Sequence, residues 1–151
     1  MIRNWAVLAG VLLSWGAPAL EPPVMEWSLD TKVPLGASPV AFPTAKPDSV
    51  LLGVGGNVLR VSGHGEVMWH TAFGPEPGRG GLYEACPADL DGDGVEEVIG
   101  GHKGGYVVAL DGGTGALLWE FNLGSSLDSW EMARAADLDG DGKAEVVASA
   151  Q

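Results

Sequence analysis

The residues best suited to chemistry are acids at alternate positions in two nearly identical loops. Residues 88–98 read ADLDGDGVEEV and residues 136–146 read ADLDGDGKAEV, so nine of eleven positions agree at an offset of 48 residues. We number each loop from its first aspartate, so that Asp89 and Asp137 are position 1. One hard cation can be surrounded by carboxylates at positions 1, 3, 5 and 9 and by a backbone carbonyl at position 7, because glycine at position 6 permits a sharp turn. The expected ligands are Asp89, Asp91, Asp93, Val95 and Glu97 in the first loop and Asp137, Asp139, Asp141, Lys143 and Glu145 in the second.

An all-oxygen, strongly anionic site of this kind suits Ca²⁺ rather than Zn²⁺ or copper, so we expect two calcium sites. An EF-hand is excluded because it needs flanking helices and an acid at position 12, where this chain has Gly100 and Ala148. Solvated Asp-Gly turns without a cation would explain one such loop, whereas two loops at a repeat period favour a metal role. Without a cation the acids of each loop would repel one another, so we expect the loops to become partly disordered when metal is removed.

The elements that must position these loops are short strands that recur every 48 to 50 residues. Runs rich in β-branched and aromatic residues cover 49–54, 57–63 and 66–72, then 96–101, 106–112 and 116–122, with glycine-rich turns between them. No segment after the N-terminus shows a sustained helical period. This pattern predicts an all-β fold of four-stranded antiparallel meanders, the blades of a β-propeller. The repeat favours that fold over a small β-sandwich.

The repeat also sets the expected organisation of the chain. After residues 1–19 it predicts a partial β-propeller over residues 20–151, with a closing strand at about 24–30, unit one at about 38–74, unit two at about 86–124 and the start of unit three at about 134–151. Propellers usually close with about 4 to 8 blades. We therefore expect an N-terminal fragment of about 2.5 blades of a larger propeller.

Residues 1–19 are typical of a secretory signal peptide. Arg3 supplies a positive charge, an apolar run extends from Trp5 to Trp15, and residues 17–19 read APA, a pattern of small residues at a cleavage site. The alternative, a membrane anchor, would need about 20 apolar residues. We expect cleavage after residue 19, no membrane span afterwards, and a secreted, periplasmic or cell-surface protein.

Composition narrows the partners and the chemistry. Twenty acidic residues against eight Lys and Arg give a net charge of -12, which argues against nucleic acid and anionic membranes as partners. A single cysteine, Cys86, allows no internal disulfide, and we expect it to be a small buried residue. The histidines His64, His70 and His102 lack metal-ligand spacing. No nucleophile or acid–base constellation is present in the sequence, so we expect no enzyme activity from this chain.

The pattern DxDGDGxxE followed by a strand resembles the calcium loop of FG-GAP or VCBS repeats, the blades of integrin-alpha-like propellers. The resemblance covers most of residues 24–151. It implies two bound calcium ions, with Val95 and Lys143 acting through their backbone carbonyls. The first unit departs from the pattern, since residues 41–49 read AFPTAKPDS without an acid at position 1, 3, 5 or 9. No calcium is expected in that unit.

A second segment, ALDGGTGALLW at residues 109–119, is similar to the tryptophan-docking motif of PQQ-type propellers. The resemblance implies that the tryptophan packs between neighbouring blades while the aspartate and threonine fix a turn, which makes Trp119 a structural residue. The preceding unit keeps Gly65 and Trp69 but has Ser62 and His64 in place of the aspartate and threonine. The sequence has no separate quinone-site signature.

Taken together, these features favour a secreted, calcium-stabilised propeller that acts as a binding or adhesion scaffold. Its ligand would be an unknown protein or carbohydrate, for which the aromatic and acidic pairs 83–84 and 130–131 are candidate contacts on one face. The remaining blades would be supplied in cis or in trans. The alternatives are the propeller portion of an extracellular enzyme, either a polysaccharide lyase or a PQQ-type dehydrogenase, and a subunit of an envelope assembly complex.

Overall fold

The computed structural model describes residues 7–9, 28–32, 38–73, 82, 85–102, 105–124 and 132–149. In these residues the chain forms twelve strands and no helix, so the expected all-β class is confirmed. None of the described segments is a helix of the length and apolarity required to cross a membrane. Most of the predicted signal peptide lies outside the described residues, as do the candidate ligand contacts at 83–84 and 130–131.

Two four-stranded antiparallel sheets form the centre of the molecule. The first contains β3 (Val40–Phe42), β4 (Ser49–Val54), β5 (Asn57–Ser62) and β6 (Val67–Ala72) in chain order. The second contains β7 (Cys86–Ala88), β8 (Glu97–His102), β9 (Tyr106–Leu110) and β10 (Leu117–Asn122), also in chain order. Each is an antiparallel meander of the kind that the strand and turn pattern predicts.

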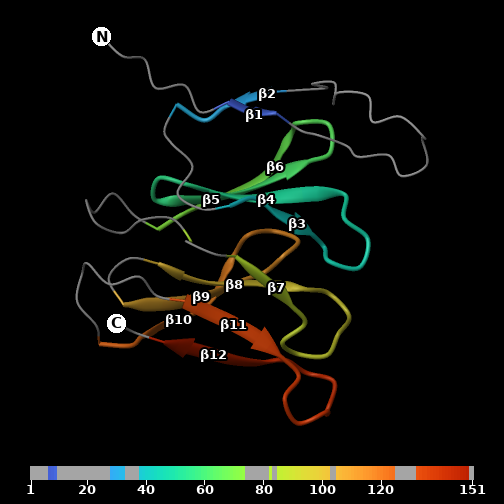
Figure 1. Cartoon of the computed structure of the whole chain (residues 1–151), viewed down its shortest axis with the longest axis vertical. Coiled ribbons are helices and arrows are strands. Elements are labelled where there is room, and N and C mark those ends of the chain that lie inside the picture. Colours follow the sequence, from blue (N-terminus) through green and yellow to red (C-terminus); the bar gives the residue numbers. More distant parts are fainter. Residues whose placement is uncertain are drawn as a thin grey trace, which may run out of the picture.

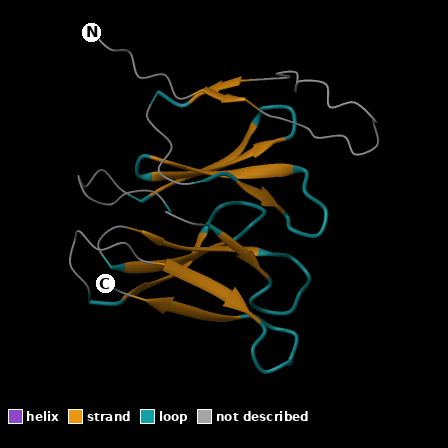
Figure 2. Cartoon of the chain, viewed as in Figure 1, coloured by secondary structure: helices purple, strands orange, loops and turns teal. Residues whose placement is uncertain are grey.

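Two smaller sheets flank these four-stranded sheets, and all four stack along the long axis of the molecule (Figure 1). β1 (Val7–Ala9) pairs with β2 (Ser28–Asp30) beyond the first sheet, and β11 (Met132–Ala136) pairs with β12 (Glu145–Ser149) beyond the second. The loops that join β3 to β4, β7 to β8 and β11 to β12 project from the same side of this stack (Figure 2). The two acidic loops are therefore neighbours in space, although 48 residues separate them in sequence.

The inner strands are buried on both faces. Along β4, Leu51 packs into the core shared with the second sheet, while Leu52 packs on the opposite side, toward β2. β9 alternates in the same way, because Val108 packs toward the first sheet and Val107 toward β11. Successive side chains of a strand point to opposite faces of its sheet. The unbroken apolar runs SVLLGV and YVVAL therefore mark strands that have no solvent face.

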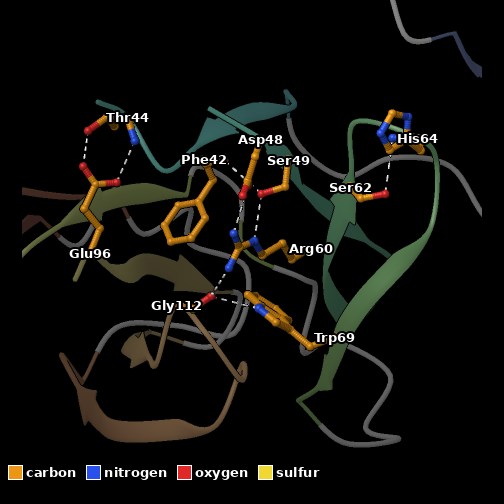
Figure 3. A network of polar contacts seen from close by, with 10 residues as sticks. All are labelled: Phe42, Thr44, Asp48, Ser49, Arg60, Ser62, His64, Trp69, Glu96 and Gly112. Atoms are coloured by element: carbon orange, nitrogen blue, oxygen red, sulfur yellow. Dashed lines mark hydrogen bonds and ion pairs between the residues drawn. The ribbon is translucent and has the colours of Figure 1, made fainter. Parts of the chain in front are cut away.

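Hydrogen bonds to one carbonyl also join the two four-stranded sheets. Trp69 Nε1 and Arg60 Nη1, both from the first sheet, donate to the Gly112 carbonyl oxygen of the second at 2.9 and 3.0 Å (Figure 3). Arg60 of β5 and Trp69 of β6 are directly opposite each other in the register of these two strands. Because this contact is buried, the two bonds are shielded from competition with water.

Arg60 is only 9% exposed, and each of its donor groups has a partner. Its Nε donates to Ser49 Oγ at 2.7 Å, and its Nη2 donates to Asp48 Oδ1 at 3.0 Å. The guanidinium also lies over the ring of Phe42, 4.7 Å from the ring centroid. The Ser49 and Arg60 side chains hold the pKa of the Asp48 carboxyl below its usual value. This network offsets the desolvation of the arginine, which would otherwise oppose its burial.

The turn after β9 is shaped to receive Trp69. Asp111 Oδ1 accepts hydrogen bonds from the backbone N–H and the hydroxyl of Thr114, both at 2.7 Å, which fixes the turn. Gly115 follows with a φ of +73°. A Cβ at Gly115 would lie 2.5 Å from Cε3 of Trp69, so only glycine fits. The tryptophan that docks on this turn thus comes from the preceding sheet, whereas Trp119 of the same motif is 37% exposed.

We expect Gly115→Ala to destabilise the fold strongly, by about 3 kcal/mol or more, because it adds a steric clash to left-handed backbone strain. The matched control is Gly124→Ala, since Gly124 has a φ of +75° with nothing within 4 Å of its Cβ position. That variant should lose only about 1–2 kcal/mol from the backbone term. Urea unfolding measures both values, and equal losses would contradict the docking contact.

Candidate metal centre

The two acidic loops occupy equivalent places between paired strands. Residues 89–96 join β7 to β8, and residues 137–144 join β11 to β12. Glu97 is the first residue of β8 and pairs with Ala88, and Glu145 is the first residue of β12 and pairs with Ala136. A regular strand therefore holds the position-9 acid of each loop at the loop's base.

In the first loop the carboxylates are oriented by backbone N–H groups of the loop itself. Asp89 accepts from Gly92 N at 2.7 Å through Oδ1 and from Gly94 N at 2.8 Å through Oδ2. Asp91 Oδ1 accepts from Asp93 N at 3.0 Å. Glu97 Oε2 accepts from the backbone N–H of Leu90 at 2.8 Å. Gly92 and Gly94, with φ of +82° and +85°, supply the left-handed backbone that this wrapping requires.

The second loop repeats this pattern bond for bond. Asp137 accepts from Gly140 N at 2.7 Å and from Gly142 N at 3.0 Å, and Asp139 accepts from Asp141 N at 3.1 Å. Glu145 Oε2 accepts from the N–H of Leu138 at 2.8 Å, as its counterpart does in the first loop. The shared sequence therefore folds into the same local structure at both places.

Each loop brings three of its expected ligands together. Ligand atoms of Asp89, Asp91 and Glu97 lie within 4.8 Å of one another, and so do those of Asp137, Asp139 and Glu145. Oxygens that bind Ca²⁺ at about 2.3–2.6 Å can lie at most about 5 Å apart across the ion. The two groups therefore have a spacing that one calcium ion could bridge.

The acids at position 5 do not join these three-carboxylate groups. Asp93 Oδ1 accepts the N–H of Val95 at 2.7 Å, and Asp141 Oδ1 accepts the N–H of Lys143 at 2.8 Å. The side chain of Val95 is 51% exposed and that of Lys143 is exposed as well. Position 7 thus carries an apolar side chain in one loop and a cationic one in the other, and the ligand role of its backbone carbonyl stays a prediction.

The electrostatics of the first loop favour a positive charge at its centre. The N–H groups of Gly94 and Gly92 lower the pKa of Asp89, so this group stays ionised. Burial raises the pKa of Glu97, and the negative charges of Asp91 and Asp89 raise it further. A buried carboxylate beside two others is destabilised in its charged form. A divalent cation would remove that penalty.

The corresponding loop of the first unit has a different length and chemistry. Residues 43–48 join β3 to β4, and this loop is two residues shorter than the acidic loops. The offset between equivalent residues of the first and second units therefore changes within this loop and is 48 residues only after it. Ser49, the first residue of β4, occupies the place of Glu97 and is bonded by Arg60. The repeat and the loop patterns did not single out Arg60. The available signal was one cationic residue among the apolar residues Val58, Leu59 and Val61 of β5.

The other residues considered in the sequence have ordinary surroundings. Cys86 is a half-buried free thiol packed against the cluster that contains Ile99 and Ala133. His70 Nε2 lies 2.7 Å from Asn57 Oδ1 across β5 and β6. His64 is exposed in the turn between the same strands, where its backbone N–H donates to Ser62 Oγ.

Comparisons with known proteins agree with this description. Residues 89–148, which include both acidic loops, match the family model described as an FG-GAP-like repeat. Among solved structures, BamB from Moraxella catarrhalis is similar with a TM-score of 0.53 and 16% sequence identity, over 76% of this chain and 31% of that one. The chain thus spans about a third of the BamB chain's length. No curated protein matches it in sequence.

The class of protein follows from the fold and these matches. Two antiparallel four-stranded sheets stacked face to face, together with likeness to a β-propeller structure, show an all-β chain built of propeller blades. The FG-GAP-like match supports a propeller repeat. The predicted blade architecture is therefore confirmed.

We expect Glu97→Gln to stabilise the metal-free protein at neutral pH, because it removes a buried charge from beside two carboxylates. The folded pKa of Glu97 is raised, so its stabilising contribution is full below the ordinary value of 4.5 and is lost as pH rises through the folded pKa. The advantage of the glutamine variant should therefore disappear in acid. Urea unfolding with a chelator, across this pH range, measures it.

The matched control is Glu145→Gln in the second loop. Glu145 makes the same bond to the loop but is only half-buried, whereas Glu97 is 7% exposed. Its substitution should have a smaller effect. Destabilisation of the metal-free protein by Glu97→Gln would contradict the repulsion within the first loop.

Proposed function

We propose that this chain is an exported calcium-binding β-propeller module that acts as a binding or adhesion scaffold. The observation that carries the proposal is one three-carboxylate arrangement built twice, with the same hydrogen bonds, 48 residues apart. Two loops with this spacing of oxygens suit a hard divalent cation. The secretory-type N-terminus would take the chain to compartments where calcium is plentiful.

In this proposal the calcium ions have a structural role. Each ion would be held first by the three gathered carboxylates at positions 1, 3 and 9. The acid at position 5, by rotating its side chain toward the ion, and the carbonyl of Val95 or Lys143 would complete the set of ligands. Each loop joins the first two described strands of its sheet, so a bound cation would fix the hairpin that begins the blade. The loops carry no catalytic role in this scheme, and the ligand of the scaffold would be a protein or a carbohydrate.

Calcium titration calorimetry on the chain, with thermal melts alongside, tests this function. We expect two calcium ions per chain and a rise in Tm, since a ligand at a hundred times its Kd stabilises a folded protein by about 2.7 kcal/mol. Asp91→Ala and Asp139→Ala should each remove one site. Glu66→Gln removes an exposed acid of the first unit and should leave both sites intact. A folded chain that binds no calcium would falsify the proposal.

A second candidate, a subunit of a larger assembly such as an envelope complex, is favoured by an exposed apolar face. Trp119 and Phe121, which lie on one face of β10, are 37% and 62% exposed. They border a hollow of about 250 Å³ that is also lined by Val107, Leu123, Val146 and Ala148. One blade earlier, Trp69 is only 7% exposed because the glycine turn of the next blade covers it. Further propeller blades, supplied in trans, would cover Trp119 in the same manner.

Sedimentation velocity tests this second candidate. The chain should self-associate at micromolar concentration, and Trp119→Ser should shift it toward monomer because the apolar anchor is lost. Met68→Ser, at a residue that is 50% exposed on β6, is the matched control and should have little effect. A wild-type chain that is monomeric throughout, and unchanged by Trp119→Ser, would argue against assembly through this face.

A further inference from the structure

The two acidic loops contact each other directly. The backbone N–H of Ala144, in the second loop, donates to the backbone carbonyl of Asp89, in the first, at 3.0 Å. The stem of Lys143 lies against Gly92, where a Cβ would be 3.4 Å from its Cγ and 3.5 Å from its Cε. Positions 7 and 8 of one loop therefore touch positions 4 and 1 of the other.

One peptide unit takes part in both loops. The carbonyl of Lys143 and the N–H of Ala144 belong to the same planar group, and in a trans peptide they point in opposite directions. The carbonyl is the position-7 ligand expected in the second loop. The N–H is bonded to Asp89, whose carboxylate belongs to the three-acid group of the first.

This geometry gives a physical route for coupling. A cation at the Lys143 carbonyl would fix the orientation of the peptide unit and polarise it, which strengthens the hydrogen bond from Ala144 to Asp89. That bond holds the backbone at position 1 of the first loop. The first loop would then lose less conformational freedom on binding its own cation.

We propose that the Lys143–Ala144 peptide couples the two loops, so that calcium binding at the second loop raises the affinity of the first. The inference rests on the proposed calcium sites. Coupling of this kind is reciprocal, so the first site must raise the affinity of the second by the same factor. Mutual repulsion of two cations has the opposite sign and is screened at physiological salt, where the Debye length is about 8 Å. The sign of the coupling thus distinguishes the two effects.

Calorimetric titration of the full chain with calcium, in buffer of physiological ionic strength, tests the coupling. Asp139→Ala should remove the second site and weaken the first by about 3- to 10-fold, the range expected for one hydrogen bond and some ordering. Asp91→Ala should weaken the second site by the same factor. A first site whose affinity is unchanged or increased by Asp139→Ala would overturn the inference.

Two substitutions address the contact itself while keeping all the acids. Ala144→Pro removes the donating N–H, and Lys143→Ala removes the stem over Gly92 but keeps the carbonyl. Ala144→Pro should leave two sites with reduced coupling, whereas Lys143→Ala keeps the whole peptide unit and should retain the coupling. If the proline variant does not fold, the reciprocal weakening by Asp139→Ala and Asp91→Ala and the exchange of the Ala144 amide decide the matter. Unchanged coupling in a folded Ala144→Pro, or complete loss of coupling in Lys143→Ala, would overturn the role of the peptide unit.

Amide hydrogen exchange provides a readout that is independent of affinity. Exchange at Ala144 should slow when calcium is added to the wild-type chain, and slow much less in Asp139→Ala. Two calcium sites of independent affinity would overturn the coupling and leave the proposed function standing. A wild-type chain without calcium binding would overturn both.

Discussion

The structure depends on the burial of each central sheet on both faces. β4, β5, β8 and β9 carry apolar side chains above and below the sheet, so neither four-stranded sheet can satisfy its core alone. Stacking of neighbouring sheets removes these side chains from water, and the hydrophobic gain scales with the area covered. Where no described strand covers the next face, apolar residues such as Phe121 remain exposed. The same packing rule thus explains both the core and the open face.

Polar groups between the first two sheets fix how these surfaces meet. Hydrophobic packing has no direction, whereas the bonds from Trp69 and Arg60 to the Gly112 carbonyl define one arrangement. A Cβ at Gly112 would lie 2.6 Å from Cζ of Phe42 in the first sheet, so a side chain here would prevent the close approach of the two sheets. The buried arginine, through its hydrogen bonds, and the turn glycines, through their lack of a side chain, therefore both determine how the two sheets pack against each other.

The loop chemistry differs between units according to the source of positive charge. In the first unit the Arg60 guanidinium lies at the base of the loop and bonds to Ser49 and Asp48. The acidic loops place glutamates at the position of Ser49 and gather two aspartates around each of them. Their carboxylates are oriented by backbone N–H groups of the same loop. In the proposed function, a divalent ion from solvent would take the role that the arginine side chain has in the first unit.

The sequence by itself located the second, third and fourth strands of each four-stranded sheet, the repeat and the candidate ligands, because these depend on local patterns. The short first strands β3 and β7 became clear only from their pairing in the structure. Alternation and turn chemistry act over a few residues, and the loop carboxylates are oriented by bonds within nine positions of one segment. Tertiary structure alone decided that Trp69 docks on a turn about 43 residues away, that Arg60 bonds to the next sheet and that Ala144 reaches Asp89. Such contacts depend on how sheets stack, and stacking is set by summed burial and steric fit that no short pattern encodes.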